Sequence, residues 1–261
     1  MEGCKPATVE VATRADARAR IAVLIPALDE EAALPHVLGD LAGVHPDRVV
    51  VVDNGSRDRT AQVAAAAGAL VVSEPRRGYG SACLAGLAAL GRGTGALRPR
   101  DVVVFLDADR SDHAEDLPSL VAPILAGEAD FVVGSRVLGG GTAALTPQQR
   151  FGNALACALM RLLFGARHTD LGPFRAIRAD ALAHLAMQDR GYGWTVEMQL
   201  KAAAAGLRVR EVPVRYRARI GRSKISGTVR GTLGAGAKIL GWIVGWRLAL
   251  WFTRRRIPRF L

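Results

Sequence analysis

The segment DVVVFLDADRSD (residues 101–112) runs from a series of valines into a cluster of acids. Its apolar part is rich in β-branched residues and too short for a buried helix, so it predicts a strand. Asp107 and Asp109 follow it two positions apart, and their side chains would share a face if the strand continued. Because crowded carboxylates repel each other, the pair predicts a bound cation. Mg²⁺ or Mn²⁺ fits best, since these ions bind carboxylate and phosphate oxygens.

Four further apolar runs alternate with segments of helical periodicity. The five predicted strands are residues 21–26, 48–53, 69–74, 101–107 and 129–135. Because these runs are continuously apolar, they are typical of strands that are covered on both faces. We therefore predict an α/β fold with a mostly parallel central sheet flanked by helices. Polar residues end the first four strands, and in such sheets ligands bind at the carboxyl edge.

Composition limits the classes of protein that remain. The chain has 261 residues, 50% of them apolar, which is enough for one domain with a sizeable core. The formal net charge of +11 predicts an anionic partner, either a phosphate, a nucleic acid or a lipid headgroup. The three cysteines are far apart, so they indicate neither a disulfide framework nor a zinc site. Residues 1–18 lack a signal-peptide pattern and are predicted to be a flexible lead of a cytoplasmic protein.

Two nucleotide-binding motifs can be set aside. The stretch GYGSAC (residues 78–83) begins like a dinucleotide-binding GxGxxG, but Cys83 stands where the third glycine belongs, and the stretch follows the third strand instead of the first. The P-loop pattern GxxxxGK[ST] does not occur. A Rossmann dehydrogenase and a P-loop enzyme are therefore not expected.

Three more acids lie just beyond Asp107 and Asp109, here named the DxD acids. Asp112, Glu115 and Asp116 immediately precede an apolar periodic segment. Acids are typical of the first turn of a helix, where they complement its dipole. We therefore assign them to the start of a helix over residues 114–126 and not to the cation.

Six motifs, in this order, resemble the inverting family 2 glycosyltransferases of GT-A fold, particularly the dolichyl-phosphate mannose and glucose synthases. They are IPALDEE (25–31), VVDNGSRDRT (51–60), RRGYGSA (76–82), LDADRSD (106–112), FVVGSR (131–136) and EVPVRYRARIGRSK (211–224). The resemblance implies a GT-A, Rossmann-like domain over residues 19–228. It also implies metal-dependent transfer of a hexose from a UDP- or GDP-sugar with inversion.

The resemblance further implies which residues bind the donor. The implied nucleotide-pocket residues are Pro26, Leu28, Glu30, Asp53, Arg77, Gly78, Asp107, Ala108 and Asp109. Among them, Asp53 would contact the base or ribose, Asp107 would face the ribose, and Asp109 would hold the metal against the diphosphate. Leu28 replaces an aromatic residue that is frequent in the family.

A hydroxyl acceptor would need a general base, whereas a phosphate acceptor is already an anion. For a hydroxyl acceptor, the resemblance makes Glu197 the leading base, with Asp170 in TDLGPFRAIR as the alternative. From spacing alone, Glu197 is equally compatible with an exposed helix acid paired with Lys201 one turn later.

For a phosphate acceptor, the resemblance points to cationic side chains. Arg136 and Arg150 align with arginines that hold the lipid phosphate in polyprenyl-phosphate synthases. Arg219, Arg222 and Lys224 resemble a basic loop that closes on the phosphates. The planar guanidinium fork suits such contacts.

The last segment, residues 229–261, is apolar, basic and rich in tryptophan. Lys238 and Arg247 interrupt it, so its uninterrupted apolar length falls short of the roughly 20 residues that a spanning helix needs. It therefore predicts an amphipathic helix at an anionic membrane surface, with packing on the domain or in a dimer as the alternative.

Together these observations predict a peripheral enzyme at the cytoplasmic face of the cell membrane that transfers a hexose to polyprenyl phosphate. One alternative is a family 2 enzyme that uses a hydroxyl acceptor on a glycan, lipid or small metabolite. A second alternative is a non-catalytic protein that binds membranes or nucleic acid. No nucleic-acid partner is expected, because aromatic residues are not interleaved through a basic stretch. A homo-oligomer remains open.

Overall fold

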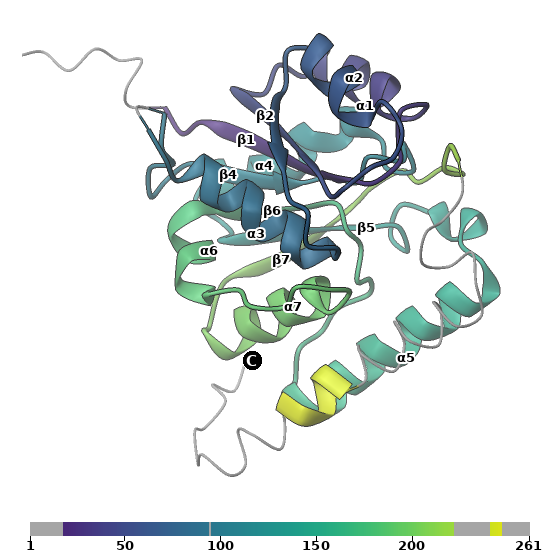
Figure 1. Cartoon of the computed structure of the whole chain (residues 1–261). Coiled ribbons are helices and arrows are strands. Elements are labelled where there is room, and N and C mark those ends of the chain that lie inside the picture. The colour runs from purple at the N-terminus through teal and green to yellow at the C-terminus, as the bar shows by residue number, and fades with distance from the viewer. Residues whose placement is uncertain (1–17, 94, 222–240, 247–261) are drawn as a thin grey trace, which may run out of the picture.

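A computed structural model of the chain describes residues 18–93, 95–221 and 241–246. Within these ranges a central sheet has the strand order β3-β2-β1-β4-β6-β5-β7 (Figure 1). The strands are β1 (Ile21–Ala27), β2 (Arg48–Asp53), β3 (Leu70–Ser73), β4 (Val102–Phe105), β5 (Phe131–Ser135), β6 (Arg175–Arg178) and β7 (Val209–Pro213). Only β6 is antiparallel to its neighbours, β4 and β5. The predicted α/β fold with a mostly parallel sheet is confirmed, and the five predicted strands correspond to β1–β5.

Helices cover both faces of the sheet. They are α1 (Leu34–Ala42), α2 (Thr60–Ala66), α3 (Tyr79–Leu90), α4 (Leu117–Leu125), α5 (Pro147–Phe164), α6 (Ala179–Leu185) and α7 (Trp194–Ala204), with short 3₁₀ turns η2 (Ala114–Asp116) and η3 (Gly141–Ala144). Successive residues of β1 point to opposite faces. Val23 and Ile25 pack with α1, α2 and α4, whereas Ala22 and Leu24 pack with α3, α6 and α7. Burial on both faces explains why the strands are continuously apolar.

Helix α5 lies beside the sheet layers and packs against α7 and residues 241–246, which form the last helical turn in Figure 1. Ile243 is fully buried there, and the Trp242 indole N–H donates a hydrogen bond to Asp189 at 2.8 Å. This part of the predicted tail therefore packs on the domain, which is the alternative that the sequence left open. The rest of residues 229–261 lies outside the described residues. No helix within the described ranges combines the length and apolar composition needed to cross a bilayer.

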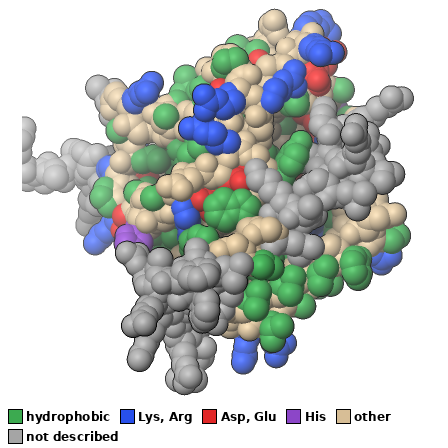
Figure 2. Space-filling model, turned by 60° about the horizontal axis from the view of Figure 1, so that its bottom comes forward, with side chains coloured by type: hydrophobic (Ala, Val, Ile, Leu, Met, Phe, Trp, Pro, Cys, Tyr) green, Lys and Arg blue, Asp and Glu red, His purple; other side chains and the backbone are tan. Residues whose placement is uncertain are grey.

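The outer side of α5 remains open to solvent. Phe151 and Leu162 are 71% and 78% exposed. Figure 2 shows hydrophobic side chains along the lower right of the view, the side on which α5 lies in Figure 1.

Asp101 fastens the start of β1 to the start of β4. Its buried carboxylate accepts hydrogen bonds from the backbone N and the Nε of Arg20, both at 2.9 Å, and from the backbone N of Arg98 at 2.8 Å. Burial alone would raise the pKa of Asp101, but the hydrogen bonds from Arg20 and Arg98 outweigh it and lower the pKa to about 2. The charged carboxylate therefore stabilises the folded state at neutral pH.

We expect Asp101→Asn to lower the free energy of unfolding by about 2 kcal/mol at pH 7. Because the folded-state pKa lies below the ordinary value, this contribution is present above about pH 4 and is lost as the pH falls toward 2. Urea denaturation at pH 7 and pH 3 measures it, with Glu128→Gln on the surface as the control. An equal loss at both pH values would show that the carboxylate charge is not responsible.

Candidate active site

The loops that follow β1 and β2 are fastened to each other at the carboxyl edge of the sheet. The backbone N–H of Asp29 donates to Ser56 Oγ at 3.0 Å, and the backbone N–H of Glu30 donates to Thr60 Oγ1 at 2.8 Å. The structure therefore places Glu30, one of the predicted nucleotide-pocket residues, beside the segment that follows Asp53.

Other predicted nucleotide-pocket residues lie along the same edge. Pro26 and Leu28 are half-buried, one near the end of β1 and one just beyond it. Asp53 ends β2, and the Arg77 Nη2 donates to the carbonyl oxygen of Gly55 at 2.8 Å. The loops after β2 and β3 are thus joined as well.

Asn54, which was not among the predicted site residues, connects these loops. Its buried amide donates to the carbonyl oxygens of Glu74 and Arg76, both at 2.8 Å, and its Oδ1 accepts from the backbone N–H of Gly78 at 2.8 Å. Gly78 has a φ of 137°, and a Cβ there would lie 2.0 Å from the carbonyl oxygen of Arg190. Only glycine allows this approach.

The acids after β4 lie at the centre of the site. Tyr79 donates a hydrogen bond from its hydroxyl to Asp107 Oδ1 at 3.1 Å. Burial and then the charge of Asp109 raise the pKa of Asp107 to about 7. Asp109 is 7% exposed, its Oδ1 accepts from the backbone N–H of Ser111 at 2.8 Å, and the intervening Ala108 is buried. The charge of Asp109 thus disfavours ionisation of Asp107, as predicted from the spacing of the two acids.

This pair fits Mg²⁺ or Mn²⁺. A dication would relieve the repulsion that raises the pKa of Asp107. The described part of the chain contains no group of three or more His, Cys, Asp or Glu side chains that could enclose a metal. An ion at Asp107 and Asp109 would therefore complete its ligand shell with other oxygens, as Mg²⁺ does with substrate phosphates and water.

The prediction that Asp112 belongs to the start of a helix is wrong. Asp112 is 3% exposed and its backbone pairs with Tyr216. Neither carboxylate oxygen has a hydrogen-bond partner among the described residues. Burial and the charge of Asp107 raise its pKa well above the ordinary value. Glu115 and Asp116 do lie in η2, which precedes α4, as predicted.

One arginine of the predicted basic loop reaches the acids. Arg219 Nη1 lies 3.1 Å from Asp109 Oδ2, and its Nη2 lies 3.2 Å from Glu30 Oε1. The other two predicted members of the loop, Arg222 and Lys224, lie outside the described residues.

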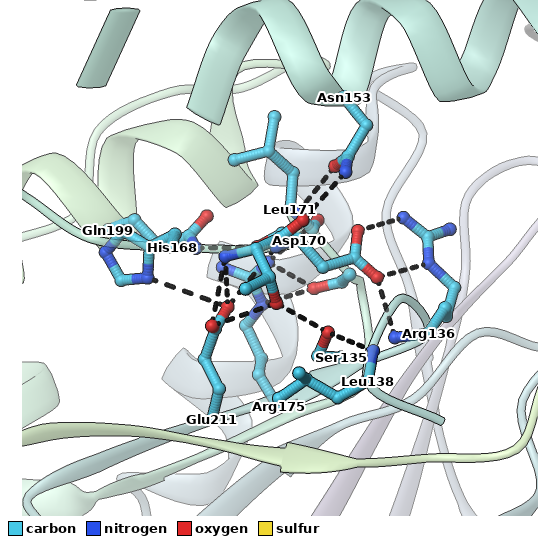
Figure 3. A network of polar contacts seen from close by, with 12 residues as sticks. Ser135, Arg136, Leu138, Asn153, His168, Asp170, Leu171, Arg175, Gln199 and Glu211 are labelled. Carbon is cyan, nitrogen blue, oxygen red and sulfur yellow. Dashed lines mark hydrogen bonds and ion pairs between the residues drawn. The ribbon is translucent and has the colours of Figure 1, made fainter. Parts of the chain in front are cut away.

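Two of the residues predicted to lie on the acceptor side, Arg136 and Asp170, contact each other in the structure (Figure 3). Arg136 donates from Nε at 2.8 Å and from Nη2 at 2.6 Å to the two oxygens of the fully buried Asp170, and its backbone N–H donates at 2.8 Å. Burial alone would lower the pKa of Arg136, but the hydrogen bonds to Asp170 outweigh it and raise the pKa. The guanidinium also lies 5.1 Å from the ring centroid of Tyr216. These contacts orient Arg136.

A second set of contacts holds the segment that carries Asp170. Gln199 donates to the backbone carbonyl of Asp170 at 3.0 Å, and Glu211 accepts from the backbone N–H of Thr169 at 2.9 Å (Figure 3). Arg175 is fully buried and donates to backbone carbonyls of the preceding turn and of α7. Neither Glu211 nor Arg175 was predicted to be a site residue, although both lie in the quoted segments.

Glu197 is fully buried, so its description as an exposed helix acid is wrong. Its Oε1 accepts from the backbone N–H of Gln188 at 2.9 Å, and its Oε2 accepts from that of Asp189 at 2.8 Å. The predicted pair with Lys201 is present at 2.8 Å. Glu197 thus fixes the loop against which α3 packs, since a Cβ on Gly80 would lie 1.9 Å from the carbonyl oxygen of Asp189.

Arg150 stands apart from these networks. It is exposed in the first turn of α5 and makes no ion pair with the other residues that the structure describes. Its predicted role toward a lipid phosphate stays a prediction.

Known proteins of similar sequence cover most of the chain. A family model for glycosyl transferase family 2 matches residues 22–186. An uncharacterized glycosyltransferase of Mycobacterium tuberculosis is 42% identical over 82% of this chain and 93% of its own length. An undecaprenyl-phosphate mannosyltransferase of Micrococcus luteus is 35% identical, with 81% and 90% covered. A polyprenol monophosphomannose synthase of Mycolicibacterium smegmatis is 33% identical, with 80% and 82% covered.

Solved structures of a similar fold include glucosyl-3-phosphoglycerate synthase from Mycobacterium tuberculosis. It superposes with a TM-score of 0.66 at 26% identity and covers 90% of this chain and 82% of its own. The same enzyme in complex with Mn²⁺, UDP-glucose and phosphoglyceric acid gives a TM-score of 0.63 at 27% identity, with 90% and 82% covered.

Proposed function

Because this chain belongs to glycosyl transferase family 2 and has the GT-A fold, we propose that it transfers a hexose from a UDP- or GDP-sugar to polyprenyl phosphate with inversion. The proposal includes dependence on Mg²⁺ or Mn²⁺. Two relatives are named for undecaprenyl phosphate and for a polyprenol monophosphate sugar, which supports this acceptor.

The donor side rests on the acids at the carboxyl edge. Asp109 and Asp107 would hold the metal, which when bound neutralises charge on the leaving diphosphate. Glu30, Asp53 and Arg77 lie on neighbouring loops that face the same edge. The solved complex of glucosyl-3-phosphoglycerate synthase with Mn²⁺ and UDP-glucose supports a metal and a nucleotide in a fold of this kind.

Support for a phosphate acceptor comes from the hydrogen bonds and the burial of the two predicted bases, Glu197 and Asp170. Both oxygens of Glu197 accept backbone hydrogen bonds, and both oxygens of Asp170 accept from Arg136. Both acids are fully buried. Either acid would have to give up a present hydrogen bond, inside the folded protein, before it could contact an acceptor hydroxyl. An attacking phosphate needs positioning and charge balance but no base, so this arrangement favours a phosphate acceptor.

A hydroxyl acceptor is the second candidate. It is supported by the likeness to glucosyl-3-phosphoglycerate synthase, which was solved with phosphoglyceric acid. In that case Glu197 or Asp170 would have to exchange its present partners for the acceptor hydroxyl.

The test is incubation of the full-length protein with UDP- and GDP-sugars, Mg²⁺ or Mn²⁺, and polyprenyl phosphate. We expect release of nucleoside diphosphate and formation of a glycosylated lipid phosphate. Turnover with a hydroxyl acceptor and none with polyprenyl phosphate would decide for the second candidate.

We expect Glu197→Gln to keep turnover with polyprenyl phosphate within about tenfold of wild type, whereas loss of a general base reduces it by roughly 10²-fold or more. The same change should lower the free energy of unfolding by about 1–3 kcal/mol, because one backbone N–H would then face an amide NH₂. Steady-state kinetics and urea denaturation measure the two effects, with Glu128→Gln as the surface control. A large loss of turnover in a folded variant would identify Glu197 as a base.

A peripheral position at the cytoplasmic face of the membrane fits this acceptor. The chain has a net charge of +11, which suits an anionic lipid surface. The exposed Phe151 and Leu162 add apolar contact area on α5. Binding to vesicles with and without anionic lipid tests this part of the proposal.

A further inference from the structure

Residues 214–220, here named the closing segment, run alongside the loop that carries the DxD acids. The backbone N–H of Arg217 donates to the carbonyl oxygen of Ser111 at 2.9 Å, and that of Ile220 donates to the carbonyl oxygen of Asp109 at 3.0 Å. Arginines occupy alternate positions of the segment, at 215, 217 and 219. The backbone of the segment is therefore fixed to the acid loop. Its three arginines contact different partners.

The first two arginines pair with acids outside the nucleotide site. Arg215 binds Asp116, which precedes α4, with Nε 2.9 Å from Oδ1. Arg217 binds Asp40 in α1, with Nη2 2.8 Å from Oδ2. Both pairs hold the closing segment in place and leave the DxD acids untouched.

Arg219 alone in the closing segment turns into the site. Its guanidinium bridges Asp109 and Glu30, whose side chains are only 10% and 8% exposed. Its Nε is buried and has no hydrogen-bond partner among the described residues. One positive charge is thus shared by two buried acids, which come from the loops after β4 and β1.

This contact conflicts with a metal ion at the same acid. Nη1 lies 3.1 Å from Asp109 Oδ2, which is the carboxylate predicted to hold the metal. A dication bound to that carboxylate at about 2.1 Å would lie within a few ångströms of the guanidinium. At such distances two cations repel strongly in a partly buried site. Metal binding at Asp109 and the Arg219–Asp109 pair therefore compete with each other.

We propose that Arg219 is a stand-in cation, which neutralises Asp109 before the donor arrives and leaves this carboxylate when the metal binds. The inference rests on the proposed function in placing the metal at Asp109. Free metal displaces Arg219 from Asp109 and brings no anion in exchange, so the guanidinium keeps only Glu30 as its acid partner in the site. A metal–diphosphate complex brings anionic oxygens that accept the released guanidinium, so the pair makes the site favour the metal–nucleotide complex over the free ion.

The test is binding of Mn²⁺ alone to the full-length protein, measured by the electron paramagnetic resonance signal of free Mn²⁺. We expect Arg219→Gln to bind Mn²⁺ roughly tenfold more tightly than wild type, because a charged hydrogen-bonded competitor is removed. The matched control is Arg215→Gln, which removes one arginine from the same segment and should keep the wild-type affinity. Arg219→Met, which keeps the apolar stem, should reproduce the gain if Arg219→Gln does not fold.

A further variant locates the ion. Adding Asp109→Asn to Arg219→Gln should abolish the gain in Mn²⁺ affinity. With UDP or GDP present, Arg219→Gln should lose affinity for the metal–nucleotide complex, the opposite sign to its effect on free Mn²⁺. Equal Mn²⁺ binding by wild type and Arg219→Gln, or a gain that survives Asp109→Asn, would overturn the proposal. No donor sugar or acceptor is used, so failure of transfer to polyprenyl phosphate would leave this result unchanged.

Discussion

Replacing Asp109 by alanine is expected to reduce turnover by about 10³-fold or more while leaving the protein folded. Asp109 lies in the turn that follows β4 and is 7% exposed. Its removal takes away the predicted metal ligand, so charge on the leaving diphosphate would develop without its counter-ion. It would also leave Arg219 with Glu30 as its remaining acid partner in the site.

Release of nucleoside diphosphate measures the effect, and circular dichroism confirms the fold. The matched control is Glu115→Ala, since Glu115 is a neighbouring acid whose side chain is 44% exposed. We expect this control to keep wild-type turnover. If Asp109→Ala retained activity, the assignment of the metal to this acid would fail, and with it the electrostatic account of leaving-group departure.

Replacing Asp170 by alanine is expected to lower the free energy of unfolding by about 3–5 kcal/mol, because it leaves a buried arginine without its counter-charge. Asp170 is fully buried, and the Arg136 side chain is only 13% exposed. The variant also removes the acceptor of the Arg136 backbone N–H. We expect turnover to fall as well, since Arg136 loses the contacts that orient it.

Urea denaturation of Asp170→Ala and of the double variant Arg136→Met/Asp170→Ala separates the two causes. The double variant has no unpaired charge, so it should recover part of the lost stability. A double variant that is less stable than Asp170→Ala would show that Arg136 stabilises the fold through contacts other than Asp170.

Much of the scaffold follows from local pattern. Continuously apolar runs bounded by polar turns predicted β1–β5, because burial on both faces leaves no polar positions within a strand. The convergence of Asp53, Asp107 and Asp109 on one edge followed from the parallel arrangement of these strands. Strands β6 and β7 escaped prediction, since RAIR and VREVP are short and carry charges. β6 is a strand because it lies between β4 and β5, where its Arg175 is buried against α7.

The sequence by itself determined the fold class, the family and the acids at the sheet edge, since periodicity and motif order are properties of neighbouring residues. Only the tertiary structure decided the state of those side chains. It buried Asp112, gave each oxygen of Glu197 a backbone donor, paired Arg136 with Asp170 across 34 positions, and brought Arg219 to Glu30 across 189. Burial and charge pairing depend on what the folded chain brings together from a distance, and no local pattern contains that information.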